Sequence, residues 1–384
     1  MSEQFEHEIL PKTTHDELAR QSFVQSLKVH LASKVSPGNK AVYEERVEPI
    51  FESEHGRPPW DRHEVRRAML TEPYYQMWSA LQRTSQEMMW DAVSTSVERQ
   101  LEELSHKAGR LERKLGSLKL DPTLPLPAYH AAVDIHCQPG GYHTELEAGD
   151  VTAGAIYDRA VYIYAMGRMG ALNDDMGASV VAYLKKALPQ FRPARILDMG
   201  CSVGHSTLPY VDVYPEAEVF AIDVAAPMLR YAHARAEALG KRVHFSQQNA
   251  ESTNFPGESF DLIVSHILLH ETSAKAVRNV VRECRRLLKK GGMAIHAEVP
   301  QYQGMAPYDA FMLDWDTYNN NEPFWGHLHD TDLKQLARES GFEESSVVQT
   351  MVPSAFEQAK ARTQLLQGGD FGGAGQWFLY ILAR

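Results

Sequence analysis

Two glycines and an aspartate follow the first apolar runs in the C-terminal half of the chain. Gly200 and Gly204 come directly after Ile196-Leu-Asp-Met199 and precede a stretch that can begin a helix. Glycine lets the backbone pass close to a ligand, and the first N–H groups of a helix lack partners within that helix. Asp223 ends the next apolar run, where its carboxylate can accept hydrogen bonds from both hydroxyls of a ribose. Together these residues predict a site for a nucleoside-like molecule at adjacent strand ends.

A dinucleotide site is the first alternative for such a turn. The phosphate-binding pattern G-x-G-x-x-G requires glycine at three fixed places. Counted from Gly200, the second and third places hold Ser202 and His205, so this pattern is absent. Asp198, two residues before the first glycine, favours a ligand with an ammonium group over one with a phosphate.

The turn resembles the first motif of the class I S-adenosylmethionine-dependent methyltransferases, which reads acid-x-Gly-x-Gly-x-Gly. The match runs from Asp198 to Gly204, with Ser202 in the place of the middle glycine. We expect a small adjustment of the backbone to accommodate this serine. The resemblance extends over residues 195–384, includes a closing antiparallel strand pair expected at 344–351 and 376–383, and implies S-adenosyl-L-methionine as the cofactor.

The resemblance also implies a cofactor site built at four successive strand ends. The first would flank the methionine part of the cofactor, the second would bind the ribose, the third would bind the adenine and the fourth would line the methionine arm. A turn with two glycines can be an ordinary connection, so the argument rests on the ordered set. The implied residues are, in that order, Asp198, Gly200, Cys201, Ser202 and Gly204; Asp223, Val224 and Met228; Asn249, Ala250 and Glu251; and Ser265, His266 and Ile267.

The segment Ile156-Tyr-Asp-Arg-Ala-Val-Tyr162 resembles the Tyr-Asp segment that many small-molecule members of this family place over the cofactor as a lid. Tyr157 could face the sulfonium, because aromatic walls favour positive charge. Arg168 could pair with the cofactor's carboxylate. The alternative for both is an ordinary position on an amphipathic helix.

Methyl transfer from a sulfonium is an in-line displacement, which needs alignment of the acceptor and needs a base only if the acceptor arrives protonated. Histidine fits that task near neutral pH. The candidate bases are His266 and His270, which follow the fourth strand, and His136 in the loop before the lid. The alternative for each is a histidine without a chemical task.

We expect no metal. His266, His270 and Glu271 could share a helical face, and Asp134, His136 and Cys137 form another group, but neither has a specific zinc spacing. Nothing near Cys201 in the sequence would activate its thiol, so this residue is expected to be a small filler.

The expected fold class is α/β, a Rossmann-like seven-stranded sheet with helices on both faces, together with an all-α N-terminal domain. Short apolar runs that alternate with amphipathic helices predict the parallel part of the sheet. The expected strands are 195–199, 218–223, 242–246, 260–265, 293–299, 344–351 and 376–383, with a helical insert near Phe356 to Leu366.

Three regions are expected along the chain. Residues 1–120 are predicted to form a helical domain that caps the site, dimerises, or does both. Pro73 would open one long helix there, with an apolar stripe that continues to Leu115. Residues 121–153 are predicted to be a proline-bearing linker and pre-lid loop, and residues 154–384 the methyltransferase domain. Within that domain we expect lid helices at 154–190 and an irregular, aromatic insert at 301–329 that helps to form the acceptor pocket.

Composition excludes several classes of protein. The chain has 384 residues and a formal charge of -11, which argues against binding nucleic acid or an anionic membrane. Its three cysteines and its acidic N-terminal residues predict a cytoplasmic protein without a disulfide framework. We therefore expect methyl transfer to a small molecule by a homodimer. The alternatives are a non-catalytic nucleoside-binding or regulatory protein, or a methyltransferase that acts on protein or RNA.

Overall fold

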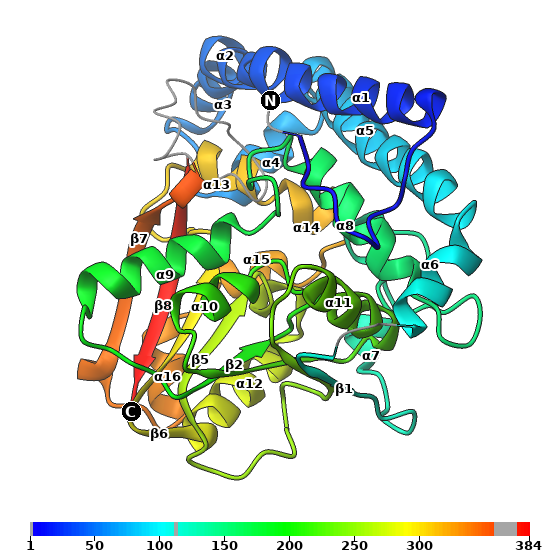
Figure 1. Cartoon of the computed structure of the whole chain (residues 1–384). Coiled ribbons are helices and arrows are strands. Elements are labelled where there is room, and N and C mark those ends of the chain that lie inside the picture. Colours follow the sequence, from blue (N-terminus) through cyan, green and yellow to red (C-terminus); the bar gives the residue numbers. More distant parts are fainter. Residues whose placement is uncertain (1–2, 111–113, 357–374) are drawn as a thin grey trace.

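The computed structural model describes residues 3–110, 114–356 and 375–384 (Figure 1). Its centre is one sheet with the strand order β1-β4-β3-β2-β5-β6-β8-β7. Strands β1 to β6 are parallel, and β8 is antiparallel to both of its neighbours. The strands are Ser117–Lys119 (β1), Arg195–Met199 (β2), Glu218–Asp223 (β3), His244–Gln247 (β4), Phe260–His266 (β5), Leu288–Glu298 (β6), Val347–Pro353 (β7) and Gln376–Ala383 (β8). The order reverses between β2 and β5, which is where an open sheet of this kind binds its ligand.

The α/β class and the closing antiparallel pair are confirmed, but the expected number of strands is wrong. The sheet has eight strands because Ser117–Lys119 pairs in parallel with β4. This segment satisfies hydrogen-bonding groups that an edge strand would otherwise leave unpaired. Gly116 permits the approach, since a Cβ at that position would overlap the Val243 carbonyl oxygen. The extra strand is only three residues long, too short for an alternating pattern to show in the sequence.

Successive residues of each strand face opposite sides of the sheet and enter different cores. Ile196 packs on one side with α9 (Asp175–Ala187), α10 (Leu208–Val213) and α11 (Ala226–Ala238). Leu197 packs on the other side with α12 (Ala274–Leu287) and α16 (Leu333–Glu339). Both sides of the parallel strands are therefore covered, and only the strand ends remain accessible to a ligand.

The region before β1 is helical, as expected, and Figure 1 shows it gathered on one side of the sheet. Within the described residues, no helix is both long enough and apolar enough to cross a bilayer. The helices are α1 (His15–His30), α2 (Ser36–Val42), α3 (Glu48–His55), α4 (Arg62–Met69), α5 (Pro73–Glu98) and α6 (Leu101–Gly109), with π-helical turns at Leu31–Val35 and Tyr43–Val47.

The prediction of a single long helix that starts at Pro73 is wrong. The helix that starts there, α5, ends at Glu98, and α6 begins at Leu101. Gln100 lies between the two helices, and its side chain accepts a hydrogen bond from the Lys12 N–H at 3.0 Å and donates to the Lys12 carbonyl at 2.7 Å. The break is thus stabilised by a segment that is distant in sequence. Met89, Trp90, Val93 and Val97 of the stripe are buried within this chain, against α8 (Thr152–Tyr164) and other elements.

The aromatic insert is helical rather than irregular. It forms α13 (Pro307–Leu313), α14 (Trp315–Asn319) and α15 (Trp325–Asp330). Tyr308, Phe311 and Trp315 pack in one core with Trp78 and other residues of the N-terminal helices. The helical insert predicted near Phe356 to Leu366 lies outside the described residues, apart from Phe356 itself. The remaining short elements are α7 (Ala128–Ala131) and 3-10 turns at Ile135–Cys137, Leu269–Glu271 and Glu344–Ser346.

Candidate functional site

A cavity of about 100 Å³ lies at the carboxyl ends of β2, β3, β4 and β5, and we call it the strand-end cavity. It brings together residues from all four predicted strand ends, and the loop before the lid adds Tyr129, His130 and Tyr142. Its lining residues are Tyr129, His130, Tyr142, Tyr157, Gly200, Ser202, Asp223, Val224, Met228, Gln248, Asn249, Ala250, His266, Ile267, Leu268, Glu271, Thr272 and Val280.

The glycine turn at the base of this cavity is held by Asp223. One carboxylate oxygen accepts the Ser202 N–H and the other accepts the Ala225 N–H, each at 2.9 Å. A carboxylate oxygen has two lone pairs, so each can accept one further hydrogen bond. Burial raises the pKa of Asp223, and the two backbone N–H bonds act against that rise. A ligand hydroxyl is therefore a suitable additional donor.

Ser202 occupies the place of the middle glycine by adopting a glycine-like backbone. Its φ is 49°, in the left-handed region, between Gly200 at 70° and Gly204 at 78°. L-residues other than glycine rarely adopt such angles, and strain of this kind often accompanies a functional site. The turn thus keeps its shape despite the serine.

The third strand end presents Asn249 and Ala250 to the cavity but turns Glu251 away. The Asn249 side-chain oxygen accepts the Glu251 N–H at 2.8 Å, which closes a tight turn. The Glu251 carboxylate accepts hydrogen bonds from Tyr129 Oη at 3.0 Å and Asn279 Nδ2 at 2.8 Å. Glu251 therefore acts on the cavity indirectly, by holding Tyr129 over its edge.

Asp198 is buried beneath the turn. Its Oδ2 accepts a hydrogen bond from Thr207 Oγ1 at 2.5 Å, and its Oδ1 lies 3.4 Å from His266 Nδ1. The other ring nitrogen of His266 contacts Tyr210 Oη at 3.0 Å. Asp198 thus lies beside His266, which lines the cavity, and does not line the cavity itself.

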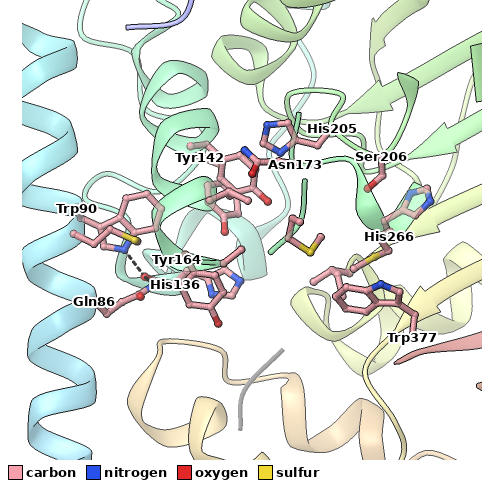
Figure 2. A pocket seen from close by; sticks show the side chains of 17 residues that line it. Gln86, Trp90, His136, Tyr142, Tyr164, Asn173, His205, Ser206, His266 and Trp377 are labelled. Atoms are coloured by element: carbon pink, nitrogen blue, oxygen red, sulfur yellow. Dashed lines mark hydrogen bonds between the residues drawn. The ribbon is translucent and has the colours of Figure 1, made fainter. Parts of the chain in front are cut away.

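A second cavity, of about 120 Å³, adjoins the first, and we call it the aromatic cavity (Figure 2). Tyr142, Tyr157, His266 and Ile267 line both cavities and so form the wall between them. The aromatic cavity is lined by Gln86, Met89, Trp90, His136, Tyr142, Tyr157, Val161, Tyr164, Ala165, Met169, Asn173, Met176, His205, Ser206, His266, Ile267 and Trp377.

Three of these lining residues, Gln86, Met89 and Trp90, come from α5 of the N-terminal helices, and Figure 2 shows this helix along one side of the cavity. Both Gln86 Nε2 and Trp90 Nε1 donate to the His136 carbonyl, at 3.1 and 2.7 Å. These bonds hold His136 in a left-handed backbone conformation, with φ of 53°. The helical region therefore helps to build the site.

The predicted base His136 lies in the aromatic cavity between carboxylates. Its Nε2 is 3.3 Å from Glu271 Oε1, and its Nδ1 is 3.1 Å from Glu322 Oε1. Asn320 Nδ2 also contacts Nδ1 at 3.0 Å. No described residue of 301–329 lines either cavity, so the insert acts on the site through contacts with lining residues: Asn320 and Glu322 contact His136, and Phe324 contacts Tyr129.

His270, another predicted base, lines neither cavity. It is fully buried, and its Nδ1 lies 2.6 Å from Glu298 Oε2. Burial disfavours the charged imidazole, but the Glu298 carboxylate outweighs burial and raises the pKa of His270 to about 9. A group held as a cation in this way is suited to a structural ion pair.

Several other predicted residues also lie away from both cavities. Ser265 is buried, with its hydroxyl 2.7 Å from His296 Nδ1. Cys201 is buried in the core beside α9 and α10, and burial raises the pKa of its thiol well above the usual value. Gly204 shapes the turn, and Arg168 lies beyond the end of α8.

Sequence reasoning missed much of the aromatic cavity. His205 was counted only as a position without glycine, and Tyr142, Met176 and Trp377 were not selected at all. Trp377 lies on β8, far from the other lining residues in the sequence. A signal existed for His205 alone, since it directly follows the glycine turn.

Comparison with known proteins locates a conserved domain type in the same part of the chain. Residues 196–292 match the family model described as a methyltransferase domain. The chain is similar to an uncharacterized methyltransferase, YcgJ, of Bacillus subtilis, with 32% identity over 37% of this chain and 53% of the relative. It is also similar to a malonyl-[acyl-carrier protein] O-methyltransferase of Methylococcus capsulatus, with 32% identity over 32% of this chain and 43% of the relative.

A third relative is a demethylmenaquinone methyltransferase of Thermus thermophilus, with 33% identity over 35% of this chain and 60% of the relative. The chain spans about half the length of these relatives. The matched residues contain the glycine turn, Asp223 and the third and fourth strand ends. Residues 196–292 are therefore similar to a methyltransferase domain, in agreement with the resemblance that the motif from Asp198 to Gly204 carries.

Proposed function

We propose that this protein transfers a methyl group from S-adenosylmethionine to a small-molecule acceptor by in-line displacement. The cofactor would occupy the strand-end cavity, and the acceptor would occupy the aromatic cavity. The observation that carries this proposal is that the two cavities are neighbours, since Tyr142, Tyr157, His266 and Ile267 line both. Because the displacement needs the acceptor in direct contact with the methyl group, the two neighbouring cavities would have to open into each other beside these side chains when both reactants are bound.

The residues of the strand-end cavity fit this cofactor. Asp223 has lone pairs left for ribose hydroxyls, and Asn249 and Ala250 lie where the adenine would bind. Tyr157 would face the sulfonium, because an aromatic ring stabilises a nearby positive charge. When bound, S-adenosylmethionine supplies an electrophilic methyl group. The protein would contribute mainly position and the exclusion of water.

The aromatic cavity favours an acceptor that carries an aromatic ring. Aromatic and methionine side chains dominate its walls, with a few polar groups that could orient the acceptor. Two relatives are named for acceptors that are a quinone precursor and a carrier-bound malonyl group, which supports a small acceptor group here.

A histidine base would be needed if the acceptor arrives protonated. Of the predicted bases, His136 and His266 line the aromatic cavity, whereas His270 is paired with Glu298 elsewhere. The homodimer and the cytoplasmic location remain predictions. Most of the apolar stripe of α5 is buried within the chain, which leaves Met77 and Leu81 of that helix for a dimer contact.

Calorimetric titration with S-adenosylmethionine and with S-adenosylhomocysteine tests the cofactor site. Binding of either at micromolar concentration is the expected result, and failure of both to bind at millimolar concentration would refute the proposal. Incubation with cofactor labelled in its methyl group and a whole-cell extract should then give a labelled product of low mass. Label found only in protein or RNA would show that the acceptor is a macromolecule.

A further inference from the structure

His205 and Asp158 form a buried pair at one end of the aromatic cavity. His205 Nε2 lies 2.7 Å from Asp158 Oδ1. Asp158 also contacts Tyr231 Oη at 2.9 Å, His7 Nε2 at 3.0 Å and Arg235 Nε at 3.3 Å through its other oxygen. Burial alone would raise the pKa of Asp158, but Arg235 and His205 outweigh burial and hold it well below its usual value. Asp158 is therefore an ionised carboxylate whose oxygens are contacted by donors from three parts of the chain: the segment before α1, the turn after β2, and α11.

Because an ionised carboxylate only accepts hydrogen bonds, His205 must donate to it through Nε2. A neutral His205 then carries its free lone pair on Nδ1. Within the described residues, Nδ1 has no hydrogen-bond partner. It is also absent from the fully buried polar atoms that lack a partner, so it is not fully enclosed by the protein. His205 lines the aromatic cavity, where Figure 2 shows it near Tyr142 and Asn173. Its Nδ1 is thus available to a molecule in the cavity.

The other two histidines of the cavity differ in this respect. His266 has Asp198 at one ring nitrogen and Tyr210 at the other, at 3.4 and 3.0 Å. His136 has a carboxylate within ion-pair distance of each ring nitrogen. Either histidine would have to give up an internal contact before it could accept a proton from a ligand, whereas His205 would not.

We propose that His205, positioned by Asp158, accepts the proton of an acceptor that enters the aromatic cavity as a phenol. This inference rests on the proposed function and names the class of acceptor for it. The aromatic walls of the cavity suit a phenolic ring, and an imidazole next to a carboxylate is a suitable partner for its hydroxyl.

The step balances with the cofactor as methyl donor. The phenol O–H bond breaks and its proton passes to His205 Nδ1. The oxygen electron pair forms the new bond to the methyl carbon as the carbon–sulfur bond breaks, and sulfur keeps that bonding pair. The product is an aryl methyl ether, and His205 then returns its proton to solvent.

Several charged or titratable groups face His205. Asp158 and Tyr157 lie on α8, Tyr231 and Arg235 on α11, and His7 in the segment before α1. Burial lowers the pKa of His205, with Arg235 and His7 acting in the same direction and Asp158 acting against them. His205 is therefore neutral at physiological pH, as a proton acceptor must be.

The test uses 4-nitrophenol as the probe, because its phenolate absorbs visible light and its neutral form does not. With the wild-type protein and saturating S-adenosylhomocysteine, the bound probe should ionise at lower pH than the free probe, with an ionisation constant about tenfold larger, or one pKa unit. In His205→Gln this difference should disappear, while the affinity for S-adenosylhomocysteine stays within about twofold. His15→Gln, which replaces an exposed histidine away from both cavities, is the control and should retain the difference.

The outcomes separate the two proposals. An unchanged difference in His205→Gln, or absence of probe binding to wild-type protein that does bind S-adenosylhomocysteine, would overturn the assignment of His205 and phenol. Loss of S-adenosylhomocysteine binding by the wild type would refute the proposed function instead. If His205→Gln fails to bind S-adenosylhomocysteine, His205→Asn provides the second measurement. Asp158→Asn should shift the ionisation of the bound probe toward that of the free probe, since it weakens the contact that orients Nε2.

Discussion

At the scale of single residues, the site depends on carboxylates whose oxygens already have partners within the protein. Asp223 accepts one backbone N–H at each oxygen and still has lone pairs for a ligand. Asp198 and Asp158 instead lie beside histidines, His266 and His205. The same residue type thus has lone pairs left for a ligand in one place and contacts another side chain in two others.

Replacing Asp223 tests its direct role. Asp223→Ala should weaken binding of S-adenosylhomocysteine by roughly 1.5 to 3 kcal/mol, the scale of a lost hydrogen bond to a charged group. Calorimetric titration measures this loss. Asp212→Ala, at an exposed position on α10, is the matched control and should leave the affinity unchanged. Equal affinities for wild type and Asp223→Ala would reject the assignment of the ribose site.

His270 predicts a specific dependence of stability on pH. Its pKa in the folded protein, about 9, lies above the ordinary value of 6.5, so folding favours the protonated form. The stability that this pair contributes is complete below about pH 6.5 and is lost as the pH rises through about 9, by up to about 3 kcal/mol. Urea unfolding at pH 6 and pH 9.5 should show this loss in the wild type.

In His270→Asn the same rise in pH should change the free energy of unfolding much less. His15→Asn, which replaces an exposed histidine, should behave like the wild type. An equal loss in wild type and His270→Asn would contradict the role given to the ion pair with Glu298.

At the scale of elements, short segments from distant parts of the chain complete the sheet and the site. The strand β1 joins the sheet through Ser117–Lys119, and the Leu115 and Gly116 N–H groups both donate to the Glu237 carboxylate on α11. The N-terminal segment reaches Asp158 through His7. Elements that are weakly predicted by their own sequence are thus fixed by tertiary contacts.

Gly116→Ala should destabilise the protein, because the new Cβ would overlap the Val243 carbonyl oxygen. We expect a loss of about 1 to 3 kcal/mol, the range for forced overpacking. Gly109→Ala is the matched control, since a Cβ at Gly109 would contact nothing within 4 Å. The free energy of unfolding in urea distinguishes the two variants, and an equal effect of both would show that β1 does not depend on this close approach.

At the scale of the whole molecule, the N-terminal helices and the sheet region share a core. Met89, Trp90 and Val93 of α5 belong to the same apolar cluster as Ile156 of α8 and Tyr231 of α11. Helix α5 also supplies part of the wall of the aromatic cavity. The residues that would bind the acceptor therefore come from both parts of the chain.

This shared core predicts that the two parts unfold together. Far-ultraviolet circular dichroism and tryptophan fluorescence should report the same midpoint of unfolding in urea, because two regions that share one core are not stable separately. Binding of S-adenosylhomocysteine, measured at increasing urea concentrations, should be lost at the same midpoint. Two separated transitions would show that the helical region and the sheet are independent domains.

The sequence by itself determined the parallel strands other than β1, the glycine turn and the polar residues at the strand ends that we propose for the ribose and the adenine. These depend on local patterns: runs of apolar residues, glycine where φ is positive, and polar residues directly after strands. Only the tertiary structure decided that β1 joins the sheet, that α5 ends at Glu98, that Ser265 and His270 face away from the cavities, and that His205 and Trp377 line the same one. Each of these depends on contacts between residues far apart in the chain, and local spacing carries no information about which distant side chain will occupy a given space.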